Sequence, residues 1–446
     1  MTGSLFQIAR SGAAAARASI ELTAQNIANA SNPDYARRSL LTREFVGVSV
    51  SQGSVLNGVL IDGISRNNTA IVQQQARSSA SELARADAEL SGLRDTELAL
   101  EQSRVFEGLV EFEAVLTQLE GNPLEPALRT NTLETARQLA NTLNFADTTL
   151  GQARAQVQDA AGITVDEINA QAAELARINR SLVNARDGTA GQAALLDARD
   201  ATLRALSDEI GVDVSFDASG AASVRVAEAG GVTGALLVDG VNPSTFAATT
   251  QANGTLAFTV GGSGVAPVRG AIAGQASALE AQAGYQNELD AITSDLIARA
   301  NAAQSTGADA DGAPGQPFFT GTSAATINLA LTSGRQIATA PAGSPAGSTN
   351  TGNLASLIAS IGADDGPVAT TDTLLLGLSS RISAADTTRT GLAAIAGNAE
   401  ATLLTETGVD LDTEAANLIR LQQAFDANAR VLQVASDIFD TLLGLR

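Results

Sequence analysis

The spacing of apolar residues constrains the fold most, because it changes along the chain from the period of a helix to that of a β-strand and back again. Residues 210–270 alternate apolar and polar positions, as at Val212, Val214 and Phe216, around Asp-Gly and Asn-Gly turns typical of tight hairpins. Elsewhere apolar residues recur three and four apart, the spacing of one helix face. These helical segments are 5–27, 68–208, 276–303 and 354–446. A β insertion between helical segments predicts that the helices before and after it form one discontinuous domain.

The predicted fold class is therefore α+β. An elongated, coiled-coil-like helical domain is built from N-terminal and C-terminal parts, and a small antiparallel β domain is inserted into it. Ample apolar content, 44% of 446 residues, supplies its core. The predicted divisions are terminal helices at 1–40 and 408–446, a discontinuous, mainly helical domain at 41–209 and 271–407, and the β domain at 210–270.

The absence of several residue types limits which catalytic and metal-binding groups the chain can offer. The chain has no Cys, His or Lys, so all 27 basic residues are Arg. Imidazole bases, thiolate nucleophiles, Schiff-base lysines and the usual zinc ligands are excluded. A carboxylate-dependent hydrolase stays open as a distant alternative, but aromatic residues, which line most sugar sites, make up only 3%. We expect no enzyme, no catalytic residue, no metal and no cofactor.

Charge and hydropathy indicate the environment. A net charge of −21 disfavours nucleic acid and anionic membranes as partners. No stretch approaches the roughly 18 apolar residues of a membrane-spanning helix, and the N-terminus lacks the basic and apolar regions of a signal peptide. We expect a soluble chain without a cleavable secretory signal. The absence of Cys permits export as an unfolded chain that folds outside without thiol errors.

The C-terminal segment carries the strongest helical period. One stripe comprises Leu418, Phe425, Leu432, Phe439 and Leu443, and a second comprises Leu421, Val431, Ile438 and Leu442. Together the two stripes form an apolar face that is wider than packing against one other helix requires. Part of this face is therefore predicted to meet something beyond its intramolecular neighbour. Asp410, Asp412 and Glu414 at the helix start complement the helix dipole.

Near the other end, LTAQNIANASNPDYARRS ends a helix rich in small residues. Pro33 and Asp34 fit the central positions of a type I turn. The turn is predicted to send Tyr35 and the arginines after it away from the helix axis. Asn26 and Asn29 allow two interpretations: polar residues that satisfy backbone groups at the helix end, or parts of one assembly motif with the turn.

These two ends carry a resemblance to a known family. AQNIANASNPDYARRS resembles the N-x-I-A-N motif and the Thr-Pro-Gly-Tyr-type turn of the flagellar axial family of rod and hook proteins, with Asp34 in place of the glycine. GVDLDTEAANLIRLQQAFDANARVLQVASDIFDTLL is more similar to the hook-associated, hook–filament junction members than to the hook or rod proteins. The stretches GVLIDGISRNNTAIVQQQAR, LLDARDATLRALSDEIGVDVSF and ADADGAPGQPFF follow in the family's order, so the resemblance covers nearly the whole chain.

The resemblance implies a structural protein of the bacterial flagellum. It would be exported by the type III apparatus without a cleaved signal peptide, and would polymerise through its terminal helices outside the cell, joining hook to filament. The implied partners are the flagellar hook protein, a second hook–filament junction protein, like subunits in a ring and an export chaperone. Another axial protein, a hook or rod component, is the alternative.

The candidate assembly residues follow from the two terminal motifs. They are Leu5, Ile8, Ala13, Ala16, Ile20, Asn26, Ile27, Asn29, Pro33, Tyr35, Leu418, Leu421, Phe425, Leu432, Ile438, Phe439 and Leu442. Small residues in the first helix are expected where terminal helices approach closely in the assembled tube. After Phe319, an outer β domain of longer family members is expected to be missing or reduced to the loop at 341–352.

Three further motifs have less specific interpretations. The residues of 309–312 resemble the start of a calcium loop, but the remaining ligand positions are absent, so an ordinary acidic loop is favoured. In LLDARD, Asp197, Arg199 and Asp200 are expected to form exposed ion pairs worth about 0.2–0.5 kcal/mol rather than an acid–base pair. The pair at 318–319 is predicted to anchor the core after a loop.

Overall fold

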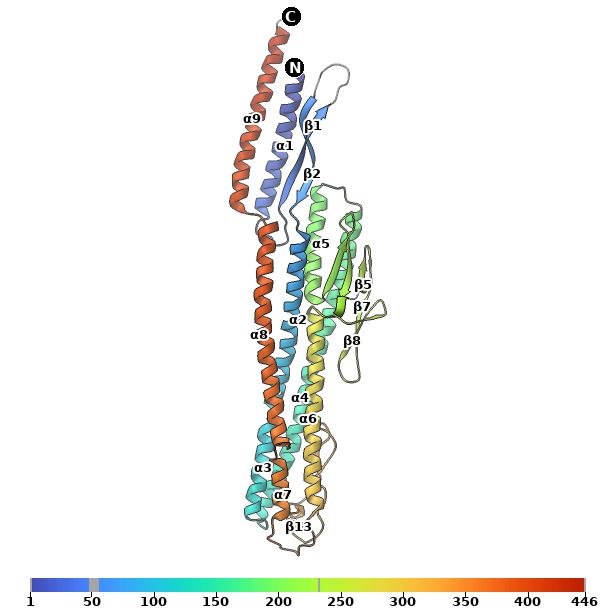
Figure 1. Ribbon diagram of the computed structural model, residues 1–446, viewed down its shortest axis with the longest axis vertical. Helices are drawn as coiled ribbons and strands as arrows, with labels where there is room; N and C mark the ends of the chain where they lie inside the picture. The colour runs from blue at the N-terminus through green and yellow to red at the C-terminus, as the bar shows by residue number, and fades with distance from the viewer. Residues whose placement is uncertain (1, 48–55, 232, 445–446) are drawn as a thin grey trace.

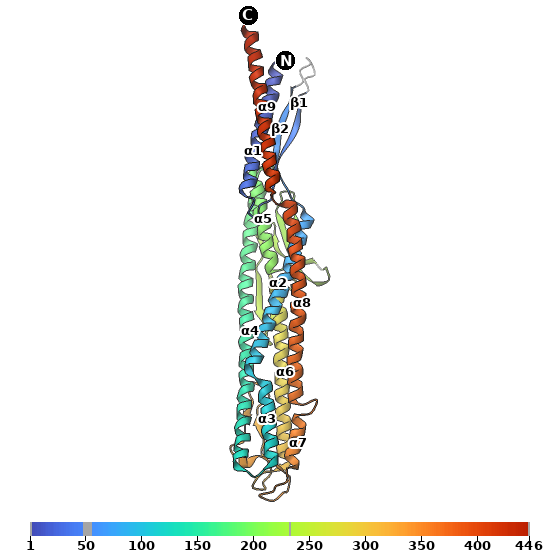
Figure 2. The same cartoon turned by 90° about the vertical axis from the view of Figure 1, so that its left-hand side faces the viewer.

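The computed structural model describes residues 2–47, 56–231 and 233–444 of the chain, which form a long rod (Figure 1). Most helices run along its length, and both termini lie at the same end. Figure 2, a quarter-turn away, shows the same narrow outline. Long helices with small antiparallel sheets confirm the predicted α+β class.

The helices of the described residues account for most of the rod. They are α1 (Thr2–Ala28), α2 (Ala70–Ser103), α3 (Val105–Gly121), α4 (Pro126–Val183), α5 (Ala190–Glu209), α6 (Ala271–Ser305), α7 (Gly352–Ile361), α8 (Pro367–Thr407) and α9 (Leu411–Gly444). Helices α2, α4, α6 and α8 pack on one another and form the trunk, and α5 packs on α4 and α2. Helices α3 and α7 lie at the end of the rod away from the termini (Figure 1).

Helices α1 and α9 pack side by side at the terminal end, and the hairpin β1 (Arg38–Gly47) and β2 (Leu56–Arg66) packs on α1. We call α1, α9 and this hairpin the terminal layer. Residues 41–66 are predicted from the sequence to belong to the mainly helical domain, and the hairpin corrects that prediction. The pairing register shifts between Leu41 and Thr42. Such a bulge breaks the simple alternation that reveals a strand in a sequence, because a slip of one residue turns every later side chain to the other face.

The inserted β region lies beside α4 and α5. Its strands are β3 (Val212–Phe216), β4 (Ala222–Ala227), β5 (Thr233–Asp239), β6 (Asn242–Pro243), β7 (Phe246–Thr250), β8 (Leu256–Val260) and β9 (Ser263–Val265). They form antiparallel sheets in the orders β3-β4-β5-β6 and β7-β8-β9. Gly240 and Gly254 adopt positive φ, as their Asp-Gly and Asn-Gly turns require.

The trunk core ends in an aromatic cluster at the far end of the rod. Phe318 and Phe319 are fully buried and pack edge-on against Phe112 of α3, with ring centroids 5.7 and 6.0 Å away. The predicted core role of this pair is confirmed. Around it, the short strands β10 (Gly307–Ala308) with β13 (Ala340–Pro341), and β11 (Phe319–Thr320) with β12 (Asn328–Leu329), close the loops.

Glu209, the last residue of α5, makes the stability of the fold depend on pH. Burial, with the charges of Glu167 and Asp208, raises its pKa to about 7. The folded chain therefore holds this proton more tightly than the unfolded chain does. The resulting stabilisation is full below the ordinary glutamate pKa and is lost as the pH rises through about 7. We expect Glu209→Gln to raise the melting temperature near pH 8 and to flatten its change between about pH 5 and 8.

Thermal unfolding followed by circular dichroism across this pH range measures the effect. The matched control is Glu111→Gln, an exposed glutamate of α3. It is expected to leave the pH profile of the wild type unchanged. A Glu209→Gln profile that overlays the wild type would show that this carboxyl group does not link folding to protonation.

Candidate assembly face and its anchor on the trunk

Small residues let α1 and α9 approach closely. Ala9, Ala15 and Ala16 are buried, and a Cβ atom added to Gly12 would lie 2.6 Å from Oδ1 of Asn428 on α9. The close approach that the sequence analysis expected between neighbouring subunits thus already occurs within one subunit. A bulky side chain at Ala16 would strain the subunit itself, so tests of assembly require exposed positions instead.

The wide apolar stripe of α9 divides into covered and uncovered parts. Leu418, Leu421 and Leu432 are half-buried, and Ala435 is buried. By contrast, the large apolar side chains that stay exposed on α9 are Leu411, Ile419, Phe425, Val431, Val434, Ile438 and Phe439. Leu442 belongs to α9, but its side chain lies outside the described part of the chain. Each of the two predicted stripes therefore packs partly on its own subunit, and each keeps large apolar side chains that are exposed within the described residues.

Helix α1 adds exposed apolar side chains at the same end of the rod. Leu5, Phe6 and Ile8 are exposed, whereas Ala13, Ile20 and Ile27 are half-buried. Contiguous exposed apolar surface is uncommon on monomeric proteins and marks interaction sites. We call the exposed apolar side chains of α1 and α9 the assembly face.

Asn26 ties together three segments of the terminal layer. Its Nδ2 donates to the carbonyl oxygen of Arg38 (2.9 Å) and to Oε2 of Glu414 (3.3 Å). Its Oδ1 accepts from the hydroxyl of Tyr35 (2.8 Å) and from the backbone N–H of Arg38 (3.1 Å). Asn26 is 1% exposed, so each bond lies away from water. The end of α1, the start of β1 and the start of α9 are thereby held in one arrangement.

The two asparagines of the motif have different roles. Nδ2 of Asn29 donates to the carbonyl oxygen of Gln25 at 2.9 Å. This bond satisfies a backbone group at the end of α1, as the first interpretation predicts. Only Asn26 bonds to the turn that completes the motif, and a role of either asparagine in assembly stays a prediction. Pro33 is exposed at the turn, but Tyr35 folds back onto Asn26 and is buried. The prediction that Tyr35 points away from the helix is wrong, because its hydroxyl group satisfies the buried amide.

Glu414 joins α9 to the chain that follows the turn. Its carboxylate is 1% exposed and accepts from Nε of Arg37 at 2.7 Å. The backbone N–H of Arg37 donates to the carbonyl oxygen of Thr407, the last residue of α8. From the sequence, Glu414 is predicted only to complement the helix dipole. Its partners lie almost four hundred residues earlier in the chain, so no local pattern could reveal this contact.

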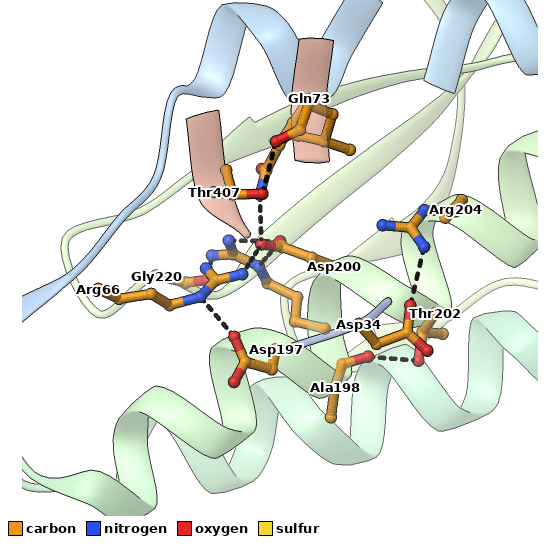
Figure 3. Close-up of polar contacts among 12 residues, drawn as sticks. Asp34, Arg66, Gln73, Asp197, Ala198, Asp200, Thr202, Arg204, Gly220 and Thr407 are labelled. Carbon is orange, nitrogen blue, oxygen red and sulfur yellow. Dashed lines mark hydrogen bonds and ion pairs between the residues drawn. The ribbon is translucent and has the colours of Figure 1, made fainter. Parts of the chain in front are cut away.

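A buried ionic cluster connects the terminal layer to the trunk (Figure 3). Asp197 accepts from Nη2 of Arg38 and Nε of Arg66, both at 2.6 Å. Asp200 accepts from Nη2 of Arg66 at 2.5 Å and Nη2 of Arg199 at 2.6 Å. The five side chains are 4–11% exposed, and we call them the junction cluster. Because Arg38 and Arg66 lie on the hairpin and both aspartates on α5, the cluster fixes the terminal layer on the trunk.

The junction cluster corrects the prediction of exposed pairs in LLDARD. Burial alone would raise the pKa of Asp200, but the charges and hydrogen bonds of Arg66 and Arg199 outweigh it and lower that pKa. Gln73 of α2 donates a further hydrogen bond to Asp200 at 2.8 Å. A carboxylate held ionised in this way is a structural partner for guanidinium groups. The pairs are buried because the hairpin, which the sequence analysis missed, covers this face of α5.

The acidic loop at 309–312 is closed by its own hydrogen bonds. Oδ1 of Asp309 accepts from the backbone N–H groups of Asp311 and Ala313, each at 2.9 Å, and Asp311 pairs with Arg335. Within the described ranges, no group of three or more acidic residues is placed to hold a metal ion. None of the described helices is long and apolar enough to cross a membrane.

Removing the Asn26 side chain tests the anchor. We expect Asn26→Ala to destabilise the terminal layer by about 1–3 kcal/mol, because Tyr35 and Glu414 lose a buried hydrogen-bond partner. Hydrogen exchange of the α1 and β1 amides measures the loss. Asn29→Ala is the matched control and should change little, because it removes a bond within one helix end. Equal exchange in both variants would contradict a special role for Asn26.

Known sequence families match both the trunk and the terminal layer. The family described as the flagellar hook-associated protein FlgK helical domain matches residues 95–319, which run from α2 through the β insertion to the aromatic cluster. The family described as the flagellar basal body rod FlgEFG protein C-terminal matches residues 402–445, which include α9.

Individual relatives agree with these families. The chain is 27% identical to flagellar hook-associated protein 1 of Escherichia coli K12 over 50% of this chain and 42% of the relative. It is 29% identical to that of Salmonella typhimurium over 50% of this chain and 41% of the relative. The chain thus spans less than half the length of these relatives.

A solved structure supports the fold. The flagellar hook junction protein FlgK from Burkholderia pseudomallei matches 55% of this chain and 46% of its own length, with a TM-score of 0.50 and 20% identity. At this identity the likeness concerns the fold alone. The helical-domain family, in contrast, covers half of the sequence. The chain therefore belongs to the family of the flagellar hook-associated protein FlgK helical domain.

Proposed function

We propose that this chain is a structural junction protein that connects the hook of the bacterial flagellum to the filament. The observation that carries the proposal is the assembly face: exposed apolar side chains of α1 and α9 gather at the end of the rod that holds both termini. Such a face gains free energy when like subunits cover it, at about 25 cal/mol per Å² of apolar surface buried. The relatives are named flagellar hook-associated protein 1, which supports a place at the hook.

The proposed partners are those that the resemblance to the flagellar family implies. Like subunits pack through their terminal layers into a ring, and the hook protein and a second hook–filament junction protein border that ring on its two sides. The junction cluster transmits the position of the terminal layer to the trunk, so that neighbouring trunks keep one orientation. No cofactor takes part, and the protein does no catalysis.

Export precedes assembly in this proposal. The chain leaves the cell unfolded through the type III apparatus without a cleaved signal peptide, and a cytoplasmic chaperone holds α9 beforehand. The exposed α9 side chains offer the anchor pattern by which an amphipathic helix enters a groove. Deleting residues 408–446 should abolish copurification with the chaperone while the β insertion stays folded. Full-affinity binding of the truncated chain would rule out α9 as the chaperone site.

Loss of the protein from cells tests the function. Cells without this chain should build hooks but release filament protein unpolymerised into the medium, and an antibody to the chain should decorate a zone between hook and filament. A hook or rod component is the second candidate, favoured by the match of residues 402–445 to the rod protein family. It predicts decoration along the hook or rod, and cells that lack the hook.

A further inference from the structure

The hairpin of β1 and β2 exposes large apolar side chains on both of its faces. Leu41, Val59, Leu60 and Ile61 are exposed by 38% to 49%. Successive side chains of a strand point to opposite faces, so Leu60 points to one face of the hairpin and Val59 and Ile61 point to the other. A hairpin of two strands is only marginally stable in water unless another element covers it. A further surface is therefore expected to cover this hairpin.

Helix α1 of the same subunit meets the hairpin along the edge of β2. The backbone N–H of Val59 donates to Oγ of Ser11 on α1 at 3.1 Å, so it points away from β1. A Cβ atom added to Gly58 would lie 2.8 Å from the same Oγ atom. Residues 41–44 and 59–62 are all exposed. Within the described part of the subunit, α1 thus supports one edge of the hairpin and leaves both faces of this stretch open.

Helix α9 lies on the other side of α1 from the hairpin (Figures 1 and 2). Asn428 and Ala435 mark the line of α9 that faces α1, because Asn428 lies against Gly12 and Ala435 is buried. Val431, Val434 and Ile438 recur three and four residues apart beside this line, and all three are exposed. We call these three side chains the outer row of α9. The terminal layer therefore has two free apolar sides, with the hairpin on one and the outer row on the other.

Charged residues of both signs border each of these surfaces. Arg43 and Glu44 are exposed on the hairpin, and Arg430 and Asp437 are exposed beside the outer row. Arg43 pairs with Asp62 at 3.2 Å, but both side chains are more than half exposed, and such surface pairs contribute little free energy. Each border can therefore offer the other an opposite charge when the two surfaces meet.

We propose that the hairpin of one subunit packs against the outer row of α9 of the next copy of this chain. The inference rests on the proposed function, because it requires like subunits side by side in a ring. A ring needs two different, complementary surfaces on each subunit. The hairpin and the outer row meet this need, since they lie on opposite sides of α1. Covering both apolar surfaces at once supplies the free energy of the contact.

Crosslinking tests the contact cleanly, because the chain has no cysteine of its own. One double variant carries Leu60→Cys with Val434→Cys, and a second carries Ile61→Cys with Val434→Cys. In isolated flagella, a short bismaleimide should link successive subunits of at least one variant into a ladder of multimers. The control, Leu60→Cys with Ile395→Cys on the trunk helix α8, should give no ladder, although Ile395 is also exposed.

The location of the protein separates this inference from the proposed function. If an antibody to the chain decorates the hook–filament junction and neither double variant forms a ladder, the contact is overturned and the junction function stands. A ladder in flagella that are decorated along the hook or rod would support the contact and contradict the junction function.

Single variants keep the test valid if the double variants do not assemble. Cells that express Leu60→Cys and Val434→Cys on separate chains should yield linked pairs and no longer products, because each chain then carries one thiol. Either single variant alone should yield no pairs. The thiol of Leu60→Cys should react with a maleimide in the purified subunit and lose most of this reaction in flagella. Protection of that thiol without any linked pairs would mean that a different protein covers the hairpin, and would overturn the proposal.

Discussion

Replacing both Phe425 and Phe439 by aspartate is expected to abolish incorporation of the protein into the flagellum while the subunit still folds. Both side chains are exposed on α9, by 37% and 54%, so the isolated subunit loses only the packing of their covered parts and keeps its buried core. In the assembly each phenylalanine contributes roughly 0.6–1.6 kcal/mol, the still exposed share of the value for full burial, and a buried unpaired carboxylate costs more than this gain. The penalty recurs in every subunit of the ring.

Three measurements follow this variant. Its free energy of unfolding should stay within about 0.5 kcal/mol of the wild type for each substitution, as is usual at exposed positions. The amount of protein in the medium reports export, and electron microscopy reports filament growth. The control is Leu376→Asp, at a leucine of the trunk helix α8 that is also exposed. Normal filaments with Phe425→Asp and Phe439→Asp together would show that the exposed stripe of α9 is not an assembly surface.

Asp200→Ala is expected to destabilise the protein by about 3–5 kcal/mol, because it leaves two buried guanidinium groups without their shared carboxylate. Arg66 and Arg199 each donate to Asp200, and neither can become neutral at accessible pH. Hairpin and trunk should therefore separate more readily. Urea denaturation measures the change, and hydrogen exchange across β1 and β2 locates it.

The pH dependence of this variant has a definite sign. Since the pKa of Asp200 is lowered in the folded state, its stabilisation is present above the ordinary aspartate pKa and is lost as the pH falls through the lowered value. The difference in the free energy of unfolding between the wild type and Asp200→Ala should therefore shrink as the pH is lowered. Asp159→Ala, at an exposed aspartate of α4, is the control and should be nearly neutral at every pH. A loss for Asp200→Ala no larger than that of the control would contradict the proposed junction.

The sequence by itself determined the features that depend on neighbouring residues. A helix face is visible as a 3.6-residue period and a hairpin as alternation around a turn, so the helices at 5–27 and 276–303 and the strands of 210–270 could be predicted. The terminal motifs were equally visible, because Asn26, Pro33 and Tyr35 lie within ten residues. They sufficed to identify the flagellar family, and the width of the apolar stripe of α9 led to the prediction that part of it meets a partner outside the subunit.

Only the tertiary structure decided which of those residues meet. Asn26 and Asn29 look alike in the sequence, but only Asn26 lies where the turn, β1 and Glu414 converge. The aspartates of LLDARD were expected in solvent because their helix alone leaves them exposed. The bulged hairpin, whose broken alternation hid it, places Arg38 and Arg66 over them. Burial and long-range pairing depend on contacts between segments far apart in the chain, and no local period encodes those contacts.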